Sequence, residues 1–301
     1  MTLPAHSRFA AALVFTLVSI ACLPASAIPS PQTPSPTLIN LISAIRAKSK
    51  SLESSPAQRH AYDSFLAAHH LAPGSIPFSD FVLVHLFFEA TRDAGYWNMH
   101  WSITDQPPNS DRIWTQWKSI AQPSFAQKSA TAECDELSAL FAFLVQRSGV
   151  KGVGLFWPYP NHTVAVWSLH PANTQPVRVV VPTSQIFLTE EDTFDTKKFD
   201  PWHQKTIYDY TRRDVPDSFE LPKPLFDFFL AQLDKYAGAS TGALQQIRNL
   251  RDAVFQQTLT PEQAALEALR RRAAFSSSVE DQAAFDHFAN DLRSSLARDP
   301  R

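Results

Sequence analysis

The sequence predicts an α+β fold with helical segments at both ends and an antiparallel sheet between them. Three observations indicate this class. Apolar residues recur at helical spacing over residues 133–148, valines and aromatics follow a period of two over residues 153–181, and four amphipathic helical segments lie beyond residue 200. Helices and strands that are grouped along the chain in this way are typical of α+β proteins.

The composition excludes several other classes of protein. The 301 residues include 44% hydrophobic residues, 23 prolines, 7 glycines and 2 cysteines. Two cysteines are too few for a disulfide-framed mini-domain or a cysteine zinc site, and the glycines form no nucleotide-binding motif. Lysine plus arginine total 27 against 29 for aspartate plus glutamate, so no basic footprint for nucleic acid is present. We therefore expect a globular protein that binds neither nucleic acid nor a cofactor.

Residues 1–27 are typical of a secretory signal peptide. A leader with one positive charge precedes an apolar run over residues 9–21, and Ala25–Ala27 is an A-x-A cleavage site. Neither this run nor any later stretch reaches the ~20 apolar residues of a membrane span. Cleavage after Ala27 predicts a periplasmic or secreted protein. Lipoprotein processing at Cys22 is the alternative, which the lack of an aliphatic residue three positions upstream disfavours.

The N-terminal part of the mature chain is predicted to be helical. Residues 28–37, IPSPQTPSPT, form a Pro/Ser-rich tether of extended character. Ser79 or Asp80 is the predicted cap of the third helix, and residues 95–127 are aromatic and irregular. Apolar residues at helical spacing predict three helices, over residues 38–52, 56–70 and 81–94.

The rest of the chain supplies one more long helix, the sheet and a helical tail. The helix over residues 133–148 stops at Gly149. Strands are predicted over residues 153–157, 163–169 and 177–181. C-terminal helices are predicted over residues 224–236, 243–259, 261–275 and 279–297. We expect an α+β domain over residues 38–220 and a C-terminal helical region over residues 221–301, which docks on the domain or binds a protein partner.

Cys134 is the candidate nucleophile. Removal of the signal peptide would leave it as the single thiol, which is then either buried and inert or reactive. It lies in the first turn of the helix over residues 133–148, where unpaired N–H groups and the helix dipole favour a thiolate. His162 begins the strand NHTVAVW after a proline-rich turn and is the candidate base. A buried core cysteine and a structural histidine are the alternatives.

Four motifs around this pair carry a resemblance to a known family. In their order and spacing, the chain resembles the transglutaminase-like cysteine protease superfamily over residues 130–185, about a fifth of its length. The motifs are ECDELSAL at 133–140, LVQRSGV at 144–150, NHTVAVW at 161–167 and VPT at 181–183. The resemblance implies a papain-like core and an exported cysteine hydrolase or acyltransferase. Its substrates would be peptides or cell-wall peptides, attacked at peptide, isopeptide or carboxamide bonds.

One residue departs from the family pattern. Val181 stands where the family has an aspartate before Pro-Thr, and a valine cannot orient an imidazole. Thr183 or Gln185, on the same strand face, would then orient His162 by a neutral hydrogen bond. Asp192 or Asp195 would have to fold back to do so. The alternative is a non-catalytic peptide-binding or scaffolding protein that has lost the aspartate.

Other residues have weaker functional interpretations. Trp97 or Trp101 would hold the oxyanion, as an upstream tryptophan does in the family, or would pack in the core. The acidic neighbours of Cys134, Glu133 and Asp135, would raise its pKa if they pointed toward it. His85 and Glu89 have the i, i+4 spacing of metal ligands, but no third ligand is recognisable, so we expect a core or surface pair.

Overall fold

The computed structural model describes residues 35–104, 111–159, 162–171, 176–184, 208–209 and 215–298. The predicted signal peptide and most of the tether lie outside these residues. The described residues belong to one compact unit that begins at Ser35. They mix helix and sheet, as the α+β prediction requires.

The three N-terminal helices form where the apolar spacing predicts them. They are α1 (Leu38–Leu52), α2 (Pro56–Ala68) and α3 (Phe78–Thr91). Helix α3 starts three residues before its predicted first residue, with Pro77 and not Ser79 or Asp80 as the N-cap. Pro77 has extended dihedral angles, and Asp80 instead lies in the first turn, where a carboxylate interacts favourably with the helix dipole.

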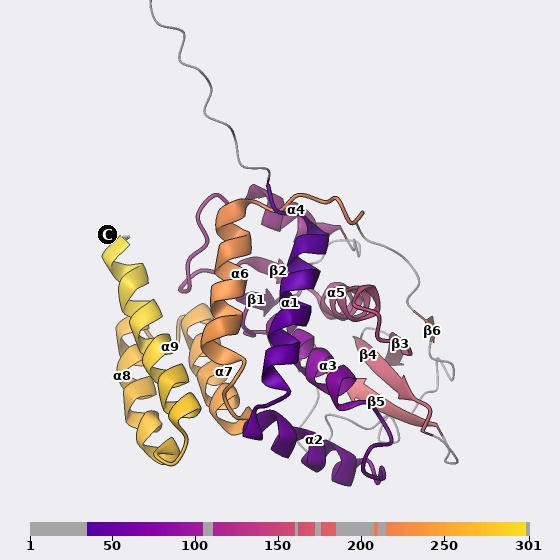
Figure 1. The fold of residues 1–301 in the computed structure, drawn as a ribbon. Helices are drawn as coiled ribbons and strands as arrows, with labels where there is room; N and C mark the ends of the chain where they lie inside the picture. Colours follow the sequence, from indigo (N-terminus) through magenta and orange to yellow (C-terminus); the bar gives the residue numbers. More distant parts are fainter. Residues whose placement is uncertain are drawn as a thin grey trace, which may run out of the picture. The chain divides into compact units, whose positions relative to one another are not determined.

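Helix α3 is the central helix of this part of the fold. From Phe81 to Thr91 it is buried on almost every side, because α1, α2 and α5 (Cys134–Arg147) pack around it (Figure 1). A helix that is apolar all round is stable only in such a surrounding. Helix α5 matches its predicted range closely. Glu133 caps its start in a capping box with Glu136, and Gly149 follows its end with a φ of +95°.

The region predicted to be irregular, residues 95–127, contains a short strand and a short helix. Strand β1 (Met99–Trp101) pairs in parallel with β2 (Ala130–Ala132), and between them lies helix α4 (Arg112–Ser119). Trp114 and Trp117 of α4 are buried and make edge-to-face contact with each other. The aromatic residues of this region therefore build the core, and β2 leads directly into the start of α5.

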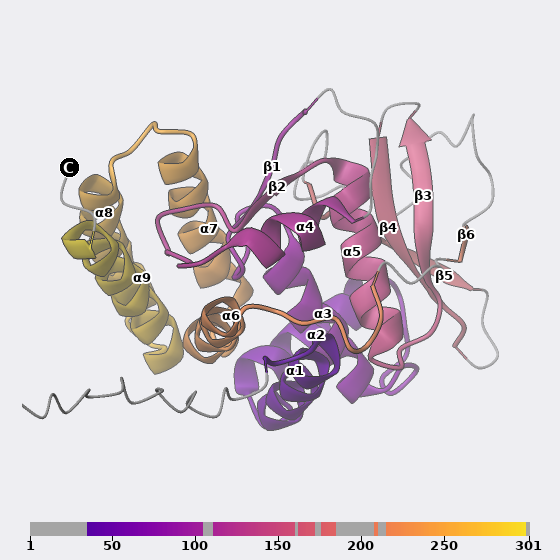
Figure 2. The same cartoon turned by 90° about the horizontal axis from the view of Figure 1, so that it is seen from above.

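The main sheet is antiparallel, as predicted. Its strand order is β5-β4-β3-β6, and α5 packs against β3 and β4 (Figure 2). The strands are β3 (Val153–Tyr159), β4 (His162–Leu169), β5 (Val177–Val181) and β6 (Tyr208–Asp209). The two-residue strand β6 was not predicted. In the β4–β5 register, Ala165 lies opposite Val181.

The two faces of the sheet have different surroundings. Ala165 and Trp167 of β4 belong to the large core shared with the helices. Val164 and Val166 instead form a small separate cluster with Phe156 and Val180. Because side chains alternate along a strand, the odd-numbered residues of β4 face the helical core and the even-numbered residues face away from it.

Four helices form the C-terminal part, as predicted. They are α6 (Lys223–Tyr236), α7 (Thr241–Phe255), α8 (Pro261–Arg272) and α9 (Val279–Arg298). Helices α7 and α8 both end before their predicted last residues, at Phe255 and Arg272, and a short 3₁₀ turn covers residues 273–275. Helices α8 and α9 lie side by side in both views (Figures 1 and 2). Within the described residues, no helix is long and apolar enough to cross a membrane.

Candidate active site around Cys134

Cys134 is the first residue of α5, and its sulfur is surrounded by backbone donors. The backbone N–H groups of Thr163, of Asp135 and of Cys134 itself lie near Sγ and favour a negative charge there. The last two belong to the helix N-terminus, where N–H groups have no partner within the helix. The first comes from β4, so α5 and the sheet meet at the thiol. All three N–H groups favour the thiolate and act to lower the pKa of the Cys134 thiol.

Burial nevertheless has a larger effect on the pKa of the Cys134 thiol than these N–H groups have. It is the largest effect on the thiol and raises the pKa of Cys134 above its ordinary value, and the charge of Asp135 acts in the same direction. The Glu133 carboxylate is engaged elsewhere, because Oε1 accepts the backbone N–H of Thr104 at 2.9 Å. Cys134 is therefore a protonated thiol at neutral pH.

His162 is the first residue of β4, and its side chain is buried. Only 1% of the residue is exposed, and burial lowers the pKa of its imidazole to about 4. The ring is therefore neutral at pH 7. His162 precedes Thr163, whose N–H reaches Sγ, but it has the even number of Val164 and Val166. Strand alternation thus directs its side chain to the sheet face opposite α5.

The residues that face α5 near Cys134 are small or hydroxylated. Thr183 is buried, and its hydroxyl lies 3.0 Å from Oγ of Ser138 in α5. Ser138 Oγ also lies 3.3 Å from the backbone oxygen of Thr163, to which it donates. This network was not predicted, although Thr183 was, as a partner for His162. Val181 lies opposite Ala165, so neither member of this cross-strand pair can orient an imidazole.

The other residues proposed as partners of His162 are not part of the described structure. Gln185, Asp192 and Asp195 all lie outside the described residues. The only proposed orienting residue that the structure describes is thus Thr183, whose hydroxyl is paired with Ser138.

The two candidate oxyanion tryptophans have different positions. Trp97 is fully buried and stacks on Phe229 of α6, with ring centres 4.4 Å apart. Trp97 therefore packs in the core, which the sequence analysis gave as the alternative to holding an oxyanion. Trp101 is half-buried at the end of β1 and lies opposite Ala132, two residues before Cys134. No contact of the Trp101 side chain with Cys134 is seen among the described residues.

Two groups of histidines and carboxylates lie away from Cys134. His85 Nδ1 lies 3.0 Å from Oε1 of Gln58, and Glu89 pairs with Arg92 at 3.0 Å, so these residues form a buried polar network. A second group, Asp93, His100 and Asp252, was not predicted from the sequence. No short motif links these three residues, which tertiary packing brings together from the segment after α3, from β1 and from α7.

No protein-family model, curated protein or solved structure matches the chain. Three N–H groups can stabilise a thiolate after its proton has left, but His162 belongs to the opposite face of the sheet. Val181, which lies opposite Ala165, has no polar atom in its side chain with which to orient an imidazole.

Proposed function

We propose that this chain is an exported, non-catalytic protein with a transglutaminase-like, papain-like core, which binds peptides or scaffolds a protein partner. In this role the buried thiol of Cys134 is a packing residue at the junction of α5 and β4. The resemblance over residues 130–185 supports the core, and the A-x-A motif at Ala25–Ala27 supports export.

The observation that carries the non-catalytic role is the register of β4 and β5. An acid that orients a catalytic histidine must be within hydrogen-bond reach of it, and directly opposite residues are the nearest neighbours in an antiparallel pair. Val181 occupies the family's acid position, and the residue opposite it is Ala165. Both are apolar, and His162 lies on the other sheet face.

A cysteine hydrolase or acyltransferase is the second candidate, favoured by the three N–H groups that act on Sγ. In that mechanism Cys134 attacks a peptide, isopeptide or carboxamide carbonyl. His162 takes the thiol proton as the C–S bond forms and returns it to the leaving amine as the C–N bond breaks. The thioacyl group then passes to water or to an amine. This function requires His162 to turn toward Sγ from the face of Val164 and Val166.

Binding and turnover by the full chain and by Cys134→Ala distinguish the two functions. We expect a displayed-peptide library to select the same peptides with either protein, since binding does not need the thiol. We also expect no cleavage and no transfer of the selected peptides or of glutamine-containing peptides. Absence of saturable binding to any peptide would contradict the binding role. Turnover by the wild type that Cys134→Ala abolishes would establish the enzyme instead.

A further inference from the structure

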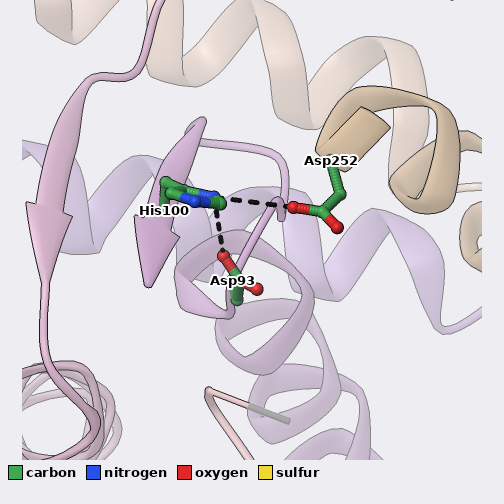
Figure 3. Close-up of side chains that lie close together, drawn as sticks. All are labelled: Asp93, His100 and Asp252. Carbon is green, nitrogen blue, oxygen red and sulfur yellow. Dashed lines mark ion pairs between the residues drawn. The ribbon is translucent and has the colours of Figure 1, made fainter. Parts of the chain in front are cut away.

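The group of Asp93, His100 and Asp252 has the composition of a metal site. Asp93 follows α3, His100 is the middle residue of β1, and Asp252 lies near the end of α7 (Figure 3). Their side chains point toward one another from these three segments. One imidazole nitrogen and two carboxylate oxygens are ligands that Zn²⁺ and Mn²⁺ accept.

The spacing of the three ligand atoms also suits one ion. Nδ1 of His100 lies 3.2 Å from Oδ1 of Asp93 and 3.6 Å from Oδ1 of Asp252. Two atoms that each lie ~2.1 Å from an ion, at angles between right-angled and tetrahedral, are ~3.0–3.4 Å apart. All three ligand atoms lie within 4.8 Å of one another, so binding would require only a small inward movement of Asp252.

Two of the three atoms that would bind an ion make no hydrogen bond within the described residues. Nδ1 of His100 and Oδ1 of Asp252 are buried, and neither has a hydrogen-bond partner among the described residues. Buried polar atoms without partners are costly, and a shared ion would satisfy both. Solvent still reaches the group, because 12% of the His100 side chain and 32% of the Asp252 side chain are exposed. Water can therefore complete a coordination shell.

Neighbouring groups hold both carboxylates in position. The Trp101 backbone N–H donates to Oδ1 of Asp93 at 2.7 Å, and Nε2 of Gln256 donates to Oδ2 of Asp252 at 2.8 Å. The latter bond leaves Oδ1 of Asp252 directed at the histidine. Outer hydrogen bonds of this kind orient the carboxylates of metal sites.

We propose that Asp93, His100 and Asp252 bind one divalent transition-metal ion of the Zn²⁺ or Mn²⁺ type. The ion would fasten α7 to the segment between α3 and β1, and water molecules would fill its remaining positions. The alternative state of the same residues is the contact of His100 with the two carboxylates alone, without a metal. The two states differ in whether added metal binds and stabilises the fold.

Titration of the EDTA-treated full chain with Zn²⁺, followed by calorimetry, tests the proposal. We expect saturable 1:1 binding and a rise in Tm with Zn²⁺ concentration, since an ion that binds only the folded state stabilises it. Asp252→Asn keeps the shape of the side chain but removes its charge. We expect it to weaken Zn²⁺ binding by about 100-fold or more. Circular dichroism of the metal-free variant checks that it folds, and His100→Gln provides a second ligand variant.

Two control variants keep the test specific. His85→Ala removes another histidine that lies near a carboxylate, and Cys134→Ala removes the thiol. Both should bind Zn²⁺ as the wild type does. The Co²⁺ complex should lack the thiolate charge-transfer absorption that a cysteine ligand produces. The absence of saturable Zn²⁺ binding would overturn the proposal, as would binding that survives Asp252→Asn or is lost in Cys134→Ala.

Discussion

The imidazole of His162 loses its hydration when the chain folds, and this burial lowers its pKa from 6.5 to about 4. The same process raises the pKa of the Cys134 thiol, because desolvation always disfavours the charged form. The two residues therefore remain neutral over the physiological pH range. An ion pair of thiolate and imidazolium, the state that primes many cysteine enzymes, is not favoured at rest.

The lowered pKa of His162 predicts a specific pH dependence of stability. The unfolded chain binds a proton at this site below pH 6.5, whereas the folded chain does so only below about pH 4. The contribution of His162 to stability is therefore complete above pH 6.5. It falls by about 3 kcal/mol as the pH is lowered to 4.

Urea unfolding of the wild type and of His162→Gln, at pH 7 and at pH 4, measures this contribution. Other groups titrate equally in both proteins, so the difference between them isolates His162. We expect the wild type to lose about 3 kcal/mol more than the variant over this range. Equal losses would show that the ring is hydrated in the folded protein.

At the scale of elements, the length of a segment decides whether its sequence predicts it. Helices α1, α5 and α9 extend over several turns, so their apolar periods are visible, and the structure matches them within one or two residues. Strands β1, β2 and β6 contain two or three residues each, too few to display a period of two. Their positions follow from their partners in the folded chain, which sequence patterns do not contain.

The candidate site also has features that the local sequence predicts and features that it does not predict. Local signals predicted that Cys134 begins a helix and that His162 lies at the start of a strand, and both elements form there. The face to which His162 belongs depends on how β4 packs against α5, and no local pattern contains that information. The group of Asp93, His100 and Asp252 is assembled wholly by tertiary packing, so the sequence carried no signal for it.

Two glycines allow a matched prediction about turns. Gly152, just before β3, has a φ of +83°, and a Cβ atom there would lie 2.5 Å from the backbone oxygen of Ser168. Gly74 has a similar φ of +77°, but a Cβ atom there would meet nothing within 4 Å. Gly74→Ala destabilises the fold only by placing an alanine in the left-handed backbone conformation. Gly152→Ala does the same and also forces the backbone of Gly152 away from that of Ser168.

We expect Gly74→Ala to lower the free energy of unfolding by about 1 kcal/mol. For Gly152→Ala we expect about 3 kcal/mol, the sum of the conformational cost and the clash. Denaturant unfolding of both variants measures the difference directly. If the two substitutions cost the same, the close approach of Gly152 to Ser168 does not exist in solution.

At the scale of the whole molecule, the C-terminal helices are joined to the rest of the fold by buried contacts. Arg251 of α7 is 3% exposed and donates to the backbone oxygen of Ala94 at 2.7 Å. Its guanidinium also lies over the ring of Phe125, 4.7 Å from the ring centre. Phe125 belongs to the same large core as Leu137 of α5 and Ala165 of β4. Because Cys134 is itself buried, we expect its thiol to become fully reactive only when the fold opens.

The rate of iodoacetamide alkylation of Cys134 between pH 5 and 9 tests the non-catalytic role most directly. A Cys22→Ser background leaves Cys134 as the single thiol, and urea-unfolded protein provides the reference rate. We predict slow alkylation of the folded protein, an apparent pKa above the ordinary ~8.5, and no change in His162→Gln. Fast alkylation with an apparent pKa well below ~8.5, altered in His162→Gln, would contradict the account and identify a working Cys–His pair.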